Sequence, residues 1–287
     1  MAVLAVVFAV LGAASNAAGT AFQRKAAAPL KQGGGLRFLL QLMHQPAWVL
    51  GILGVAGAAL FQALALFNGP IALVQPLFVL ELPFALMFIG PLLKRWIPRE
   101  GWYGVAGVVL GLVMLLLCAA PSGSATDAPM DQWIPALIGC YGLIAVAVFI
   151  SRVRSSGLVR AGALGSAAAV GNAMTAAMLK SATGTFSSQG FTAFLSAWQT
   201  YGFALTGIAA VLLLENALQA GPLAASQPAL TIGDAAVSLL LGITVFDESV
   251  RTGWWILPEA ISICFICAGV VVLVRAIPKI EGPGVTQ

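Results

Sequence analysis

One stretch of the chain occurs twice, each time inside an apolar segment. Residues 69–76 (GPIALVQP) return as residues 221–228 (GPLAASQP), an offset of 221 − 69 = 152. The same offset relates Gly90 to Gly242. Two copies of one membrane unit in a single chain are typical of secondary transporters, whose substrate site lies between the copies. The repeat therefore predicts a membrane protein made of two related halves.

The composition also places the chain in a lipid bilayer. Hydrophobic residues make up 60% of the chain and charged residues only 8%, whereas a soluble domain carries about 25% charged residues. The basic residues are few and lie between apolar runs, so we expect no nucleic-acid partner. A membrane span needs about 20 apolar residues. Nine segments reach this length or nearly so: 2–23, 47–68, 70–93, 101–119, 133–151, 159–182, 192–217, 222–246 and 253–276.

The first of these segments is expected to remain in the protein as a span. Its charges, Arg24 and Lys25, follow the apolar run, whereas those of a signal peptide precede it. The longest link comes next, at 26–46, and we expect its residues 36–43 to form a helix at the membrane surface.

The distribution of lysine and arginine predicts the orientation of the nine spans. If the links alternate between two sides, twelve of the 14 basic residues fall on one side, and only Lys180 and Arg251 fall on the other. Cytoplasmic links of membrane proteins carry an excess of Lys and Arg. We therefore expect a multi-pass protein of the cell membrane, with its N-terminus outside and its C-terminus in the cytoplasm.

The first helix belongs to the repeat with a slightly different offset. Asn16 corresponds to Asn172, and Arg24 to Lys180, at 172 − 16 = 156. Both helices carry small residues at every fourth position, which lets helix backbones approach closely in a membrane. These residues are Ala9, Ala13, Ala17 and Ala21 in the first helix, and Gly165, Ala169, Ala173 and Ala177 in the sixth.

The predicted fold is all-α, with nine transmembrane helices and an inverted repeat. Helices 1–4 form the first repeat in residues 1–120, and helices 6–9 form the second in residues 159–287, which end in a short cytoplasmic tail. Residues 121–158 hold an outer loop and helix 5, an unpaired connector that inverts the second copy relative to the first. Inverted repeats alternate access to a central site by exchanging conformations between the halves.

A few ionisable and polar side chains fall within the predicted spans. An ionisable residue at the bilayer centre costs about 2.5–3.5 kcal/mol on insertion scales, so such residues are functional candidates by default. Glu81 and Asp234 lie about 17 Å along their helices at 1.5 Å per residue, in nearly equivalent places of the two copies. Gln227, Thr231, Asp234 and Ser238 recur on one helix face and form a polar stripe.

These patterns define the candidate residues for binding a solute or an ion. They are Asp234, Glu81, Glu215, Asn16, Asn172, Gln75, Gln227, Thr231, Lys180, Asn216 and Gln62. For a metal cargo, Glu81, Asp234 and Glu215 are the candidate ligands. The alternative is that these groups pair with one another and only hold the helices together. For Lys180 two interpretations stand: it is the counter-ion of one of the two acids, or it extends outward to the membrane surface.

The sequence contains no enzyme motif. It has no histidine-based triad and no Walker loop, so we expect no catalytic activity and no cofactor. Pro76 and Pro228 stand in matching Gln-Pro steps, where each proline leaves a helical carbonyl unpaired one turn earlier. These carbonyls either line a cavity or mark simple kinks.

Several short motifs resemble those of a known family. They are Phe22-Gln23-Arg24-Lys25 closing helix 1, Pro46-Ala47-Trp48-Val49-Leu50-Gly51 opening helix 2, Lys180-Ser181-Ala182 ending helix 6, Asn216-Ala217-Leu218 before the second Gly-Pro, and Phe246-Asp247-Glu248 ending helix 8. This order resembles the drug/metabolite transporter superfamily, and in its details the nine-helix, magnesium-transporter-like branch of the NIPA type. The resemblance implies the fold given above and the transport of a metabolite or of Mg²⁺. That branch usually carries a glutamate in helix 2, near the place of Ala59 in this chain.

Three functions are compatible with the sequence. The first is a gradient-driven transporter that moves a small solute or cation by alternating access, through a cavity between helices 1–3 and helices 6–8. The second is a carrier of divalent cations such as Mg²⁺, which takes oxygen ligands. The third is a non-transporting membrane component that binds lipid or takes part in an assembly, for which an inverted repeat is not needed. The expected partners are the lipid bilayer and the cargo, with a second copy or a paired membrane protein as further alternatives.

Overall fold

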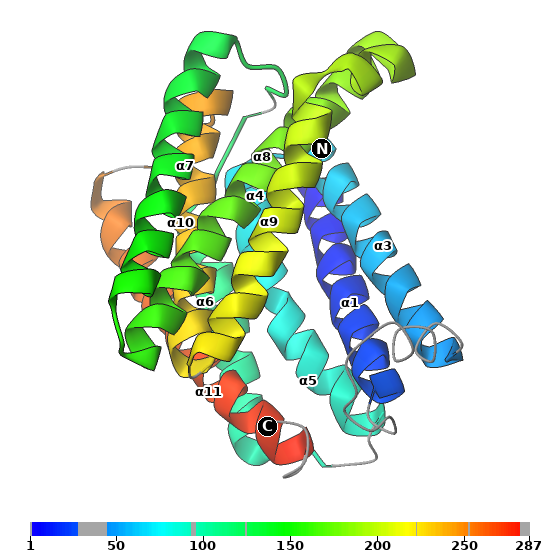
Figure 1. The fold of residues 1–287 in the computed structure, drawn as a ribbon, viewed down its shortest axis with the longest axis vertical. Coiled ribbons are helices and arrows are strands. Elements are labelled where there is room, and N and C mark those ends of the chain that lie inside the picture. The colour runs from blue at the N-terminus through cyan, green and yellow to red at the C-terminus, as the bar shows by residue number, and fades with distance from the viewer. Residues whose placement is uncertain are drawn as a thin grey trace.

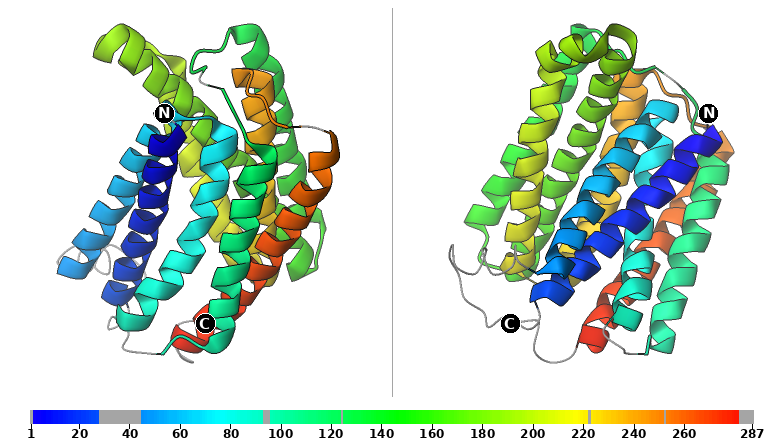
Figure 2. Two further views of the ribbon diagram at one scale, coloured as in Figure 1. Left: turned by 180° about the vertical axis from the view of Figure 1, so that it is seen from behind. Right: turned by 90° about the vertical axis from the view of Figure 1, so that its right-hand side faces the viewer.

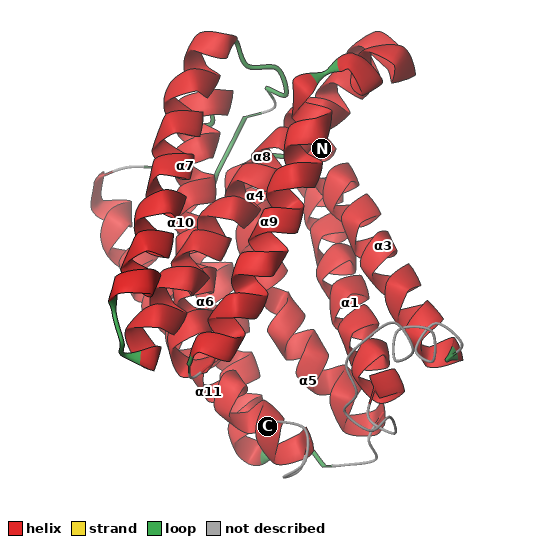
Figure 3. Cartoon of the chain, in the orientation of Figure 1, coloured by secondary structure: helices red, strands yellow, loops and turns green. Residues whose placement is uncertain are grey.

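All regular elements in the described part of the chain are helices. The computed structural model describes residues 2–27, 45–92, 96–123, 125–221, 223–251 and 253–281. Figure 3 shows helices and loops in this part of the chain. Ser122 and Ser249 form an isolated antiparallel bridge between two of the loops. The surface helix expected at 36–43 lies outside the described residues. The elements are α1 (Ala2–Ala27), α3 (Pro46–Asn68), α4 (Ile71–Leu77), η1 (Phe78–Leu80), α5 (Glu81–Leu92), α6 (Arg99–Ala119), α7 (Met130–Val153), α8 (Gly157–Ser196), α9 (Trp198–Ala220), α10 (Leu223–Phe246), η2 (Gly253–Trp255) and α11 (Ile256–Glu281).

Nine helical stretches of the described residues are long and apolar enough to cross a membrane. Two of them combine shorter elements, since α4, η1 and α5 form one span and η2 joins α11. Prolines stand at or just before the first residue of four helices, where the missing N–H has no helical partner to lose. They are Pro46 in α3, Pro70 before α4, Pro98 before α6 and Pro129 before α7. These helices confirm the prediction of an all-helical protein with several spans long and apolar enough to cross a membrane.

The link between the sixth and seventh spans is shorter than the sequence indicated. A polar link was expected at 183–191, but α8 continues as helix to Ser196, is kinked at Gly190 (φ 85°), and turns into α9 at Ala197. Hydroxyl groups explain the continuation. Thr183 donates to the Lys180 carbonyl (2.8 Å), and other hydroxyls of this stretch bond to carbonyls one turn earlier. Because these polar side chains are satisfied by their own helix, they do not end it.

Two groups of helices pack in a similar way, and small residues form both contacts. In the first half α1 packs against α3 and α5, and in the second α8 packs against α9 and α10. The stripe Ala9, Ala13 and Ala17 is fully buried on α1, as are Ala169 and Ala173 on α8. Figures 1 and 2 show α7 to α10 on one side of the bundle and α1 with α3 on the other. Helices α6 and α11 pair with each other and so join the halves.

The third span is broken, whereas its counterpart in the second half is continuous. After Pro76 the backbone leaves the α-helix for the 3₁₀ turn η1 and resumes as α5 at Glu81. Pro83 follows, and its ring would clash with the carbonyl of Val79 in a regular α-helix. The equivalent position in the second copy (83 + 152 = 235) is Ala235, and α10 remains helical across Pro228. The single Pro228 is thus accommodated within a helix. The span that contains both Pro76 and Pro83 is broken.

Candidate functional site

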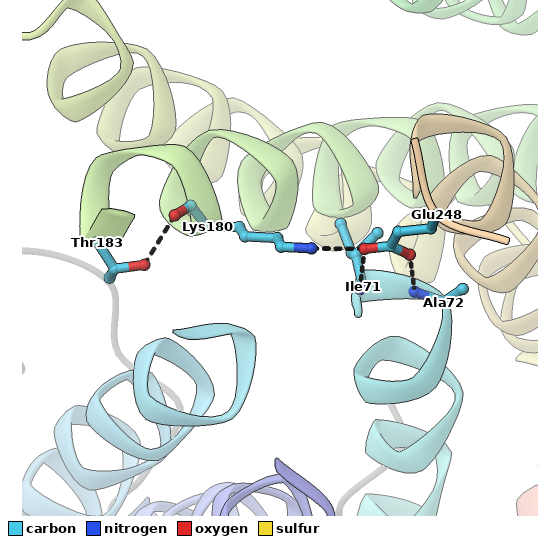
Figure 4. A network of polar contacts seen from close by, with 5 residues as sticks. All are labelled: Ile71, Ala72, Lys180, Thr183 and Glu248. Atoms are coloured by element: carbon cyan, nitrogen blue, oxygen red, sulfur yellow. Dashed lines mark hydrogen bonds and ion pairs between the residues drawn. The ribbon is translucent and has the colours of Figure 1, made fainter. Parts of the chain in front are cut away.

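A buried ion pair connects α8 with the loop that follows α10. Nζ of Lys180 lies 2.5 Å from Oε1 of Glu248, and the two side chains are 1% and 0% exposed. Figure 4 shows the lysine side chain extended toward the carboxylate. Burying two charges costs several kcal/mol per ion, which the pair offsets only with good geometry and further hydrogen bonds.

Those further bonds come from the other half of the chain. The carboxylate of Glu248 accepts the N–H of Ile71 at Oε1 (2.6 Å) and the N–H of Ala72 at Oε2 (3.0 Å). Both N–H groups belong to the first turn of α4, where the helix itself offers no acceptor. Glu248 therefore caps the start of the third span while it neutralises Lys180, and a charged acceptor makes such bonds strong.

The backbone around Glu248 holds its carboxylate in this place. Helix α10 ends at Phe246, and Asp247 adopts a left-handed conformation (φ 49°) that turns the chain back. The N–H of Glu248 then donates to the carbonyl of Gly242 (2.9 Å). A Cβ at Gly242 would collide with the Glu248 carboxylate, so a larger residue here would displace that carboxylate from its present place.

Aromatic rings cover the ion pair. Nζ of Lys180 lies 4.5 Å from the centroid of the Phe246 ring, a cation–π contact. Trp133 of α7 meets Phe246 edge-on at 6.0 Å and Trp198 of α9 at 5.2 Å. Trp133 is buried, and within the described residues its indole N–H has no hydrogen-bond partner. Contacts thus run from Lys180 on α8 through Phe246 at the end of α10 to Trp133 on α7 and Trp198 on α9.

A second connection lies beside the first. Ser122, after α6, and Ser249, after α10, exchange both backbone hydrogen bonds (2.9 and 2.8 Å). Their hydroxyl oxygens are 2.7 Å apart. The N–H of Arg251 also donates to the carbonyl of Ala119 (3.0 Å). The loop after α10 is therefore attached to both α4 and α6 of the first half.

Some of the predicted polar residues meet each other within the spans. Nε2 of Gln62 on α3 donates to Oε1 of Gln75 on α4 (3.3 Å), and Gln75 is buried. The hydroxyl of Ser238 donates to Oδ1 of Asp234 (3.3 Å), both on α10. Ser238 is fully buried and Asp234 is half-buried. These pairs place amide and carboxylate groups on α4 and α10, which pack against each other.

Other candidates are spread over the bundle. Asn16, Asn172, Gln227 and Thr231 are half-buried on α1, α8 and α10. Glu215 and Asn216 are exposed on α9, and the Asn216 amide donates to its own helix at Leu212 (2.7 Å).

Glu81 and Asp234 lie on helices with different neighbours. Glu81 lies at the start of α5, which packs mainly against α1 and also touches α6 and α11. Asp234 lies on α10, which packs against α4, α7, α8 and α11. In the part of the chain that the structure describes, no three His, Cys, Asp or Glu residues lie close enough to hold a metal ion. Glu81, Asp234 and Glu215 thus form no metal cluster there.

The partner of Lys180 is the residue that sequence reasoning missed. The sequence offered Asp234 or Glu81 as a counter-ion, or an outward-pointing lysine, whereas the structure shows a buried lysine paired with Glu248. One signal was available. An acid just after the C-terminus of a helix faces the negative end of the helix dipole, so Glu248 needs a compensating group elsewhere.

Comparison with known proteins gives one relative. Over 265 residues the chain is 30% identical to a protein of Corynebacterium glutamicum described as an uncharacterized protein, and the match covers 88% of each chain. The chain belongs to the same family as that protein. No family model matches the sequence, and no solved structure matches it either.

Proposed function

We propose that this chain is a gradient-driven transporter of the drug/metabolite type, which moves a small solute or cation by alternating access between its two halves. The observation that carries the proposal is the matched packing of α1 on α3 and α5, and of α8 on α9 and α10. Together with the repeated sequence at 69–76 and 221–228, this packing supports two copies of one unit. The proposed orientation has the N-terminus outside and the C-terminus in the cytoplasm.

The polar groups on α4 and α10 supply the proposed binding site. Gln75 and Asp234 lie within apolar spans on helices that pack against each other across the halves. Polar residues in such positions are costly, and they commonly mark a substrate or ion pathway. In this proposal Asp234 binds a cation, a proton or a basic group of the solute, and Gln75 offers hydrogen bonds. The proposal includes no catalytic step and no cofactor.

A flux assay with purified protein in liposomes tests the proposal. The probes are free amino acids, polyamines and Mg²⁺, applied one at a time with and without a proton gradient. We expect at least one probe to move, and Asp234→Asn to reduce its flux by about tenfold or more, because a hydrogen bond to a charged group is worth about 1.5–3 kcal/mol and 1.4 kcal/mol corresponds to tenfold. Asp127→Asn is the matched control, since this acid is exposed in the loop before α7.

Each outcome of the assay distinguishes the functions that the sequence left open. Flux of Mg²⁺ alone would favour the divalent-cation carrier. Unchanged flux in Asp234→Asn would contradict the site assigned here. A folded protein that moves none of the probes would favour the non-transporting component that binds lipid or joins an assembly.

A further inference from the structure

We propose that Lys180, Glu248 and the N–H groups of Ile71 and Ala72 form a latch that closes one side of the bundle and opens during transport. The inference rests on the proposed function. It adds a contact that controls access to the proposed binding site. The latch connects the second half, which supplies both charged side chains, with the first half, which supplies both N–H groups. It holds the two halves together at the start of the third span.

The chemistry of the contact suits a latch better than a permanent joint. Stability alone does not explain the pair, because a buried ion pair commonly adds little net stability over apolar side chains of similar volume. Apolar side chains, however, could not accept the N–H groups of Ile71 and Ala72. An ion pair differs in its response to water. It is strong in a dry, low-dielectric setting and weak once solvated, so separation of the halves would weaken it progressively.

The surroundings keep the closed latch dry. Phe246 covers Lys180, Trp133 packs against Phe246, and Gly242 fits closely against the carboxylate. Ile71 faces α10, since its side chain comes within 3.0 Å of a Cβ built on Gly242. Ile71 is itself fully buried. The face of α4 at the latch is thus shielded from solvent in this structure.

The position that the repeat relates to Glu248 is not an acid. The repeat relates Glu248 to residue 248 − 152 = 96, which is Trp96 and is 97% exposed. The repeat therefore places no carboxylate at the position equivalent to Glu248. In this structure the latch lies on the side of Lys180.

Chemical labelling of a cysteine at the latch tests the proposal. Ile71→Cys keeps the backbone N–H and places a thiol on the shielded face of α4, in a chain whose native cysteines (Cys118, Cys140, Cys264 and Cys267) are replaced by alanine. The probe is a membrane-impermeant maleimide added to the protein in liposomes. We expect Glu248→Gln and Lys180→Met each to raise the labelling rate by about tenfold or more, because each leaves its partner unneutralised.

Two neighbouring charges provide matched controls. Asp247 and Arg251 lie in the same loop and are exposed, so Asp247→Asn and Arg251→Gln should leave the labelling rate within about twofold. Asparagine also tolerates the left-handed backbone at position 247.

A further variant guards against loss of folding. The double variant Lys180→Met/Glu248→Leu leaves no unpaired buried charge, and it too should label faster, because it has lost the cap on α4. Unchanged labelling in this folded double variant would overturn the latch.

The labelling readout does not depend on a transported solute. If the parent protein moves a probe but labelling stays constant in Glu248→Gln, the latch is wrong and the proposed function stands. If labelling rises in that variant while none of the probes moves, the latch is supported and the proposed function is contradicted.

Discussion

Ser122 and Ser249 exchange both backbone hydrogen bonds although 127 residues separate them in the chain. The pair joins the end of α6 in the first half to the loop after α10 in the second. It lies beside Glu248, since Gly123 comes within 3.1 Å of the Glu248 Cα when a Cβ is built on it. This bridge offers a place to fix the halves covalently.

A disulfide at the bridge should arrest transport. Two residues that exchange both hydrogen bonds have Cα atoms about 5.5 Å apart, which fits a disulfide. We expect Ser122→Cys/Ser249→Cys, with Cys118 replaced by alanine, to form the bond under mild oxidation and to lose flux in liposomes by about tenfold or more. Reductant should restore the flux. Each single-cysteine variant is a control, and full flux in the oxidised double variant would contradict movement at this side.

The ion pair should also show strong energetic coupling. Lys180→Met leaves a buried carboxylate without its cation, and we expect it to lower the free energy of unfolding by about 3–5 kcal/mol. Glu248→Leu should have a similar effect. The double variant should be more stable than the sum of the two losses predicts, by about 2 kcal/mol or more in a double-mutant cycle. Denaturation in detergent measures these values, and additive losses would show that the two side chains do not depend on each other.

Two glycines on α8 should respond differently to the same substitution. A Cβ at Gly165 would come within 2.7 Å of the Ser226 carbonyl oxygen on α10, whereas nothing lies within 4 Å of one at Gly162. We expect Gly165→Val to lower the free energy of unfolding by about 1–3 kcal/mol through overpacking. Gly162→Val should change it by less than about 0.5 kcal/mol. Equal effects would show that α8 and α10 are not held by close backbone packing.

The 3₁₀ turn in the third span should depend on Pro83. Pro83→Ala restores an N–H that can donate to the Val79 carbonyl, so the segment Phe78–Leu80 should become α-helical. We expect hydrogen exchange of its amides to slow by about tenfold, which corresponds to 1.4 kcal/mol. Pro228→Ala is the control, because α10 is already helical across Pro228. Unchanged exchange in Pro83→Ala would assign the break to Pro76 or to tertiary packing instead.

Local features of the sequence were enough to predict most of the spans. Apolar length, the Gly-Pro steps and the prolines at helix starts act within one segment. The spans predicted from them agree closely with those of the structure except around the link before α9. The exception was the link before α9. There Thr183, Thr185 and Ser188 looked like loop residues, but their hydroxyl groups bond within the helix.

The sequence by itself determined that this chain is a helical membrane protein with repeated segments, because hydropathy and small-residue spacing are properties of single helices. Only the tertiary structure decided which charges meet. Lys180 and Glu248 lie 68 residues apart, and Ile71 lies 177 residues from the same carboxylate. No local pattern records such a contact. It exists because the packed halves bring Lys180, Glu248 and the start of α4 together in a buried place. There the carboxylate neutralises the lysine and accepts the N–H groups of the helix start.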